Sequence, residues 1–191
     1  MSNLNSNSVS TVVPAVQRLL DGAHEVFAER GYHAANVHEI CAHAQVGIGT
    51  FYANFDHKRQ LLQRLMVERA VTIPSLLTSA DLASPERLAA RLHTLIDDPR
   101  SAGLWRAWHQ AVVEEEDLAR FQAQWWPATI GQLAVLIEVA RQEHPSRREL
   151  IDAPTVAWMT LTLSRELVLS DRQHAPDVEG LARLVHRLVF G

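Results

Sequence analysis

The chain has 191 residues and a formal net charge of −4, with 47% apolar and 21% charged residues. This composition is ordinary for a soluble globular protein of one domain or two small ones, and no apolar run approaches the ~20 residues that a membrane span needs. The single cysteine, Cys41, excludes an intramolecular disulfide, so we expect a cytoplasmic protein without membrane association.

The N-terminal segment, residues 1–13, contains no pattern of a folded element. Its first ten residues are rich in Ser and Asn and lack the basic and hydrophobic regions of a secretory signal. We therefore expect a disordered tail.

A first helix follows this tail. Apolar residues recur at helical spacing from Val16 to Phe27. Pro14 suits the opening turn, and Gly31 suits the residue just past the helix end. The pattern predicts one amphipathic helix between these two residues.

Two shorter helices are predicted next. Asn36 is the expected N-cap of a segment over residues 37–44, and Glu39 stands where a capping box places its carboxylate. A tight turn at residues 45–47 leads to a third helix over about residues 48–54. Three short helices with such a turn predict a helix-turn-helix unit.

The rest of the chain is again helical, which predicts an all-α fold of about nine helices. Prolines suited to a first helical turn are Pro85, Pro99, Pro154 and Pro176. Pro127 falls inside a long helix and should kink or split it. We expect a three-helix DNA-binding domain at residues 14–63 and a larger ligand-binding and dimerisation domain at residues 64–191.

The third predicted helix divides into two faces. Phe51 and Phe55 lie one turn apart and can pack against the first two helices. Gly47 and Gly49 remove side chains near the helix start, where backbone N–H groups favour a closely approaching anion. The opposite face of this helix is therefore a candidate for entering a DNA groove.

Residues 19–62 resemble the tetracycline-repressor (TetR) family of DNA-binding regulators. The resemblance is carried by Phe27-Ala28-x-x-Gly31-Tyr32, Val37-x-x-Ile40, Val46-x-x-Gly49-Thr50-Phe51-Tyr52-x-x-Phe55 and Lys58-x-x-Leu61-Leu62. It implies that Thr50 and Tyr52 contact the DNA backbone and that Lys58 binds a phosphate. It also implies that the base edges are contacted by Ile48, Gly49, Ala53 and Asn54.

Several features depart from the family's pattern. Gln45 stands where the turn normally has glycine, the third helix has no Arg or Lys, and residues 15–64 hold five basic and five acidic residues. We therefore expect weak, salt-sensitive non-specific DNA affinity. His38 matches a position that is often basic in the family. We expect it to contact DNA and to strengthen binding below about pH 6.5, where histidine becomes charged.

All five tryptophans lie beyond the helix-turn-helix. Three predicted helices each combine aromatic side chains with a polar group, a pattern typical of an apolar ligand pocket but also of an ordinary core. The candidate ligand-binding residues are Trp105, Trp108, His109, Phe121, Trp125, Trp158 and Thr162. The family resemblance implies a ligand enclosed by the C-terminal helices, which we expect to be a small hydrophobic effector.

The last two helices carry apolar stripes that predict a dimer interface, although the same stripes could face the domain's own core. The candidate interface residues are Val156, Met159, Leu163, Leu167, Leu181, Leu184, Val185 and Leu188. Two such helices from each chain would form a four-helix interface. A single helix without basic residues cannot bind DNA tightly, so we expect a homodimer on a palindromic operator.

These expectations combine into a transcriptional repressor that a small hydrophobic effector releases from double-stranded DNA. The alternative is a ligand-independent DNA-binding or adaptor protein. We expect no enzyme, cofactor or metal, because the sequence has no metal-ligand spacing and no phosphate or dinucleotide motif. The acidic run at residues 114–117 is interpreted as the solvated start of a helix.

Overall fold

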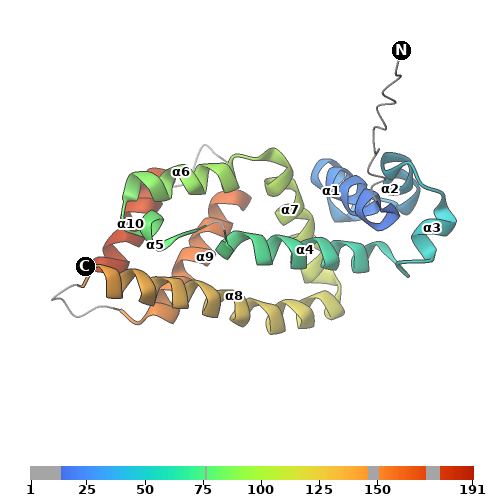
Figure 1. The fold of residues 1–191 in the computed structure, drawn as a ribbon. Coiled ribbons are helices and arrows are strands. Elements are labelled where there is room, and N and C mark those ends of the chain that lie inside the picture. The colour runs from blue at the N-terminus through green and yellow to red at the C-terminus, as the bar shows by residue number, and fades with distance from the viewer. Residues whose placement is uncertain (1–13, 76, 146–150, 171–176) are drawn as a thin grey trace, which may run out of the picture.

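The computed structural model describes residues 14–75, 77–145, 151–170 and 177–191, without the side chains of residues 69–75, 95 and 96. Within these ranges the chain forms ten helices and no strand (Figure 1). They are α1 (Ala15–Ala34), α2 (Val37–Ala44), α3 (Ile48–Tyr52), α4 (Lys58–Ser75), α5 (Ser79–Leu82), α6 (Pro85–Ile96), α7 (Pro99–Glu114), α8 (Glu116–Glu143), α9 (Ala153–Leu169) and α10 (Val178–Phe190). The expected all-α fold is confirmed. The predicted tail at residues 1–13 lies outside the described ranges.

Local signals account for the helix ends around α2. The Asn36 side chain accepts a hydrogen bond from the Glu39 backbone N–H at 2.9 Å, so it caps α2 as predicted. The Glu39 carboxylate turns toward Arg30, 3.9 Å away, instead of completing a capping box. Gly31 interrupts α1 with a φ of 73°, a left-handed backbone that glycine adopts without steric cost.

The turn between α2 and α3 keeps a left-handed backbone although it lacks glycine. Gln45 has φ 54° and ψ 44°, and its backbone N–H is directed at the carbonyl oxygens of Ala42 and Cys41. This conformation costs a non-glycine residue about 1–2 kcal/mol. The packing of α2 against its neighbours therefore holds the turn in a shape that its own sequence disfavours.

Two predictions about the C-terminal helices are corrected in detail. The four-residue α5 is too short to produce an apolar period, which explains why one helix more is found than expected. Pro127 lies inside α8, which runs as one helix of 28 residues and is not split. The acidic run spans the junction of α7 and α8. Glu115 has an extended backbone, and Glu116 and Asp117 lie exposed in the first turn of α8, in agreement with a solvated helix start.

The apolar side chains form two cores. The first joins α1–α4 with Trp108 of α7 and Leu118 of α8, and the second joins α5, α6, α9 and α10 with the later part of α8. On α8, Pro127 lies between Trp125, which packs on the first core, and Ile130, which packs on the second. In Figure 1, α1–α3 lie at one end of the molecule and α5, α6 and α10 at the other, with α4 and α8 running between them.

Helix α7 packs closely on α1. A Cβ at Gly103 would overlap the backbone of Ala28, so the two helices meet at a residue without a side chain. The helix-turn-helix unit (α1–α3) is thus built into a core that includes part of the C-terminal region. Within the described ranges, no helix is both long and apolar enough to cross a membrane.

Candidate nucleic-acid interface

Helix α3 is anchored by the two phenylalanines that the sequence assigns to its inner face. Phe51 is fully buried, and its ring centroid lies 5.9 Å from that of the half-buried Phe55. The helix ends at Tyr52, two residues earlier than expected, and the chain continues in a turn closed by the bond from Phe55 N–H to Phe51 O at 2.9 Å. This anchoring fixes which side of α3 faces outward.

The outward face carries most of the predicted DNA-contact residues. Tyr52 is 59% exposed and Ile48 is 38% exposed. The exposed set also includes Gly47, Gly49, Ala53, Asn54 and, on α2, His38, whereas Thr50 is half-buried. A Cβ at Gly47 or Gly49 would meet nothing within 4 Å. The protein's own packing therefore does not require glycine there, and the backbone at the start of α3 stays open to an outside molecule.

Lys58, the predicted phosphate ligand, has internal partners. Its ammonium donates to the carbonyl oxygens of Tyr32 at 2.6 Å, Ala35 at 2.9 Å and His33 at 3.3 Å. Three donors are all that an ammonium has. Burial lowers the pKa of Lys58, and the nearby Glu115 carboxylate opposes this shift. The geometry shows Lys58 holding the chain after Gly31, and its phosphate contact stays a prediction.

The other cations of the helix-turn-helix region also have partners within the protein. Arg30 pairs with Glu39, Arg59 with Glu115 and Asp117, and Arg64 with Glu68. Arg18 is likewise engaged in an interaction within the protein. Helix α3 itself has no charged residue, so its outward face presents neutral groups. Both features are in keeping with the expectation of weak non-specific affinity.

Comparison with known proteins identifies this region. Residues 19–65 match the family model described as bacterial regulatory proteins, tetR family. The match to the TetR family thus lies in this segment, which contains α2, α3 and parts of α1 and α4. The regulator UidR of Escherichia coli K12 is 32% identical over 62 residues, a match that spans 32% of this chain and 32% of UidR. The similarity to that curated relative thus covers about a third of its length.

Solved structures extend the similarity of the fold to nearly the whole chain. GusR of Salmonella enterica superposes with a TM-score of 0.74 over 96% of this chain and 97% of GusR, at 17% identity. FadR of Bacillus subtilis, solved in complex with stearoyl-CoA, superposes with a TM-score of 0.68 over 92% of this chain and 97% of FadR, at 22% identity. At identities this low, the superpositions show only that the chains share a fold. The family model and UidR are both described as regulators.

Four of the seven predicted ligand residues form one aromatic cluster. The Trp125 ring lies 6.2 Å from that of Phe121, 6.3 Å from that of Trp108 and 6.5 Å from that of Trp105. Trp108 is 2% exposed, and its indole N–H donates to Gln122 Oε1 at 2.7 Å. The cluster packs on the first core. Its geometry favours the ordinary-core interpretation that the sequence left open.

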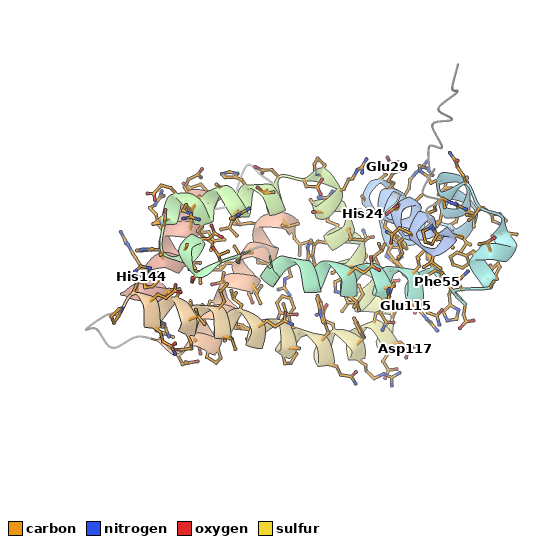
Figure 2. The ribbon with its side chains drawn as sticks, in the orientation of Figure 1. His24, Glu29, Phe55, Glu115, Asp117 and His144 are labelled. Carbon is orange, nitrogen blue, oxygen red and sulfur yellow. The ribbon has the colours of Figure 1, made fainter. Side chains whose placement is uncertain are left out.

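The remaining three ligand candidates lie outside this cluster. His109 and Trp158 are exposed, and Thr162 is half-buried on α9. A cavity of about 550 Å³ opens elsewhere, at the ends of α8 and α10, and none of the seven candidates lines it. Its lining consists of Ala83, Glu143, His144, Pro145, His186 and Phe190. Figure 2 shows His144 at the end of α8 that lies farthest from Glu115.

The predicted dimer residues fall into two groups. Val156, Leu167, Leu181 and Val185 are buried in the second core of their own protomer. Leu184 is 41% exposed, and Met159, Leu163 and Leu188 are half-buried. The apolar stripes of α9 and α10 are thus used largely within the chain, and only part of each is accessible to a partner.

Sequence reasoning missed the polar contacts between the helix-turn-helix unit and the α7–α8 junction. Tyr32 Oη donates to Glu115 Oε1 at 2.8 Å, and Arg59 Nη1 donates to Glu115 Oε2 at 3.2 Å. Figure 2 shows Glu115 and Asp117 at the end of α8 nearest α1–α3. The one sequence signal for these contacts was Tyr32, because an aromatic residue directly after a helix-ending glycine needs neighbouring groups that bury its ring.

Proposed function

We propose that this protein is a homodimeric transcriptional repressor that binds a palindromic operator through α3 and is released by a small hydrophobic effector. The observation that carries the proposal is the division of α3 into two faces. Tyr52 is 59% exposed and Ile48 38% exposed, whereas Phe51 between them is fully buried. A helix held in this way presents its outer face to the major groove in helix-turn-helix proteins.

The chemistry of the outer face suits neutral contacts to DNA. The hydroxyl groups of Thr50 and Tyr52 can donate to phosphate oxygens, and the apolar Ile48 and Ala53 suit thymine methyl groups. Asn54 can read adenine, after its side-chain amide leaves the Thr50 carbonyl oxygen, to which it now donates at 2.8 Å. Because no Arg or Lys lies on α3, tight binding needs two copies acting together.

Uncharged faces of α8 and α9 support the dimer. Residues 121–137 of α8 and residues 153–164 of α9 contain no charged residue, and the two helices pack together. Val135 is 66% exposed and Trp158 is 51% exposed. Interface centres are depleted of charge and enriched in aromatic residues. A second copy therefore fits best on α8 and α9, with the exposed Leu184 of α10 as a further contact.

The effector is proposed from the fold. FadR of Bacillus subtilis, which shares this architecture, holds stearoyl-CoA. A ligand releases DNA only if it binds better to the conformation in which the two copies of α3 are out of groove register. The alternative, a ligand-independent DNA-binding or adaptor protein, is favoured by the way the aromatic cluster fills the first core.

The test starts with the full-length protein and a random-sequence duplex pool. We expect selection to enrich a palindrome whose footprint shows two half-sites about one helical turn, ~10 base pairs, apart, and light scattering to give a dimer. No enriched sequence, or protection of a single half-site, would contradict the proposal. Stearoyl-CoA and stearate then serve as effector probes. Weaker binding in their presence supports the repressor, and unchanged binding to the selected duplex favours the ligand-independent alternative.

A further inference from the structure

A set of four side chains, here called the clasp, joins the helix-turn-helix unit to the α7–α8 junction. It consists of Tyr32, Arg59, Gln110 and Glu115. Besides the two bonds that Glu115 accepts from Tyr32 and Arg59, Gln110 Oε1 accepts the Tyr32 backbone N–H at 2.9 Å. The Glu115 carboxylate thus accepts one hydrogen bond on each of its oxygens, from Tyr32 near the end of α1 and from Arg59 at the start of α4.

The clasp is built at a place where the backbone is tightly determined. The positive φ of Gly31, 73°, favours glycine, and a Cβ there would lie 2.7 Å from Gln110 Oε1 and displace the end of that side chain. Lys58 holds the carbonyl oxygens of the same turn from α4. The chain after Gly31 is therefore held by hydrogen bonds from two sides, from α4 and from the α7–α8 junction.

Glu115 is placed to report how α7 and α8 meet. It is the one residue between the two helices, and its backbone is extended at φ −103° and ψ 102°. A change in the angle between α7 and α8 would therefore move its carboxylate away from Tyr32 and Arg59. The hydrogen bond from Tyr32 is the largest influence on the pKa of Glu115 and lowers it, which favours the charged form that accepts both bonds.

We infer that the clasp fixes the orientation of α1–α3 relative to α7 and α8, with Glu115 as the positioning residue through which movement of those helices changes DNA affinity. The inference rests on the proposed function for its link to DNA. Helix α4 is the covalent connection to the C-terminal region, and the packing of α1 on α7 is a second attachment. The clasp adds hydrogen bonds of defined geometry to this packed interface. These bonds select one orientation of the interface, and breaking them lets the helices adopt another.

A contribution to stability alone is the competing interpretation. The side chains of Arg59 and Glu115 are 34% and 30% exposed, and ion pairs this accessible contribute little to folding. The neighbouring pair of His33 and Glu114, at 3.3 Å, is 52% and 59% exposed and also links α1 to α7. Glu114→Ala is therefore a matched control, because it removes a carboxylate one residue away from the clasp.

The first measurement is a distance between spin labels within one protomer. Labels are attached at Ala42→Cys on α2 and Ala90→Cys on α6, both exposed positions, in a full-length chain with Cys41→Ala. Labelled protein is diluted with unlabelled protein, and double electron–electron resonance gives the distance distribution. We expect Glu115→Ala and Tyr32→Phe to shift or broaden it, Glu115→Gln to retain most of the parent distribution, and Glu114→Ala to leave it unchanged. An unchanged distribution in Glu115→Ala would overturn the inference.

The second measurement is the affinity of the same variants for the duplex selected by the parent protein. We expect Glu115→Ala to weaken specific binding about tenfold, a typical size for coupling between distant sites, with a smaller change on random-sequence DNA. A shifted distance with unchanged specific affinity would overturn the link to DNA. If the parent selects no duplex, the proposed function fails, while the distance measurement still decides whether the clasp sets the orientation.

Discussion

The ammonium of Lys58 lies 4.5 Å from the centre of the Tyr32 ring and donates a hydrogen bond to the Tyr32 carbonyl oxygen at 2.6 Å. The first residue of α4 thereby closes the chain that follows α1. A lysine that the family resemblance assigns to DNA is, in the free protein, part of the contact that holds the helix-turn-helix unit to α4.

Replacing Lys58 tests this internal role. We expect Lys58→Met, which keeps the aliphatic stem, to lower the free energy of unfolding by about 2 kcal/mol, because partly buried carbonyl oxygens lose a charged donor. Urea denaturation measures the change. Arg64→Met is the control, since its pair with Glu68 is exposed and should contribute about 0.5 kcal/mol or less. Unchanged stability together with lost DNA affinity would instead support a role limited to phosphate binding.

The close approach of α7 to α1 predicts opposite effects for two glycine substitutions. Gly103→Ala should destabilise the protein by about 1–3 kcal/mol, because its Cβ would overlap the Ala28 backbone and force the helices apart. Gly131→Ala on α8 meets nothing within 4 Å and should stabilise it by up to about 1 kcal/mol through helix propensity. Thermal unfolding followed by circular dichroism compares the two, and equal effects would contradict the packing described here.

His93 gives the stability a pH dependence. Its ring nitrogens lie 3.0 Å from Glu179 Oε1 and 2.7 Å from Asp97 Oδ2, and these hydrogen bonds raise the pKa of His93 above its usual value. A pKa raised by folding means that the contribution is fully present below the unfolded value, about 6.5. It is lost as the pH rises through the higher folded value.

The pH prediction is checked by urea unfolding at pH 6 and pH 9. The parent should lose more stability between these values than His93→Gln does, and the difference should be small because the site is exposed. His109→Gln, an exposed histidine on α7, controls for the loss of an imidazole. If His93→Gln and the parent lose equal stability, the bridge between α6 and α10 does not titrate as described.

Short-range features of the fold could be predicted from the sequence. The Asn36 cap, the interruption at Gly31 and the inner position of Phe51 each depend on residues within one or two helical turns. The left-handed Gln45 shows the limit of this reasoning, because the surrounding fold imposes a conformation that the residue itself disfavours.

Long-range partners could not be predicted in the same way. An apolar stripe shows that Val185 must be covered, but it does not show whether the cover is its own protomer or a second copy. Likewise, the sequence alone predicts a solvated carboxylate at Glu115. The fold brings the hydroxyl of Tyr32, 83 residues away in sequence, to within 2.8 Å of that carboxylate. The outward face of α3 could be predicted from the sequence, because all of its residues lie on one short helix.

The outer face of α3 is tested most directly by the affinity of Tyr52→Ala for the selected duplex, measured by fluorescence anisotropy. Gln142→Ala, an exposed position on α8 outside the proposed dimer contact, is the control. Because Tyr52 is 59% exposed, the unfolding free energy of Tyr52→Ala should stay within about 0.5 kcal/mol of that of the parent protein. We predict that Kd rises at least about tenfold, or ~1.4 kcal/mol, in Tyr52→Ala alone. Binding by Tyr52→Ala that equals that of the parent would contradict the claim that this face contacts DNA.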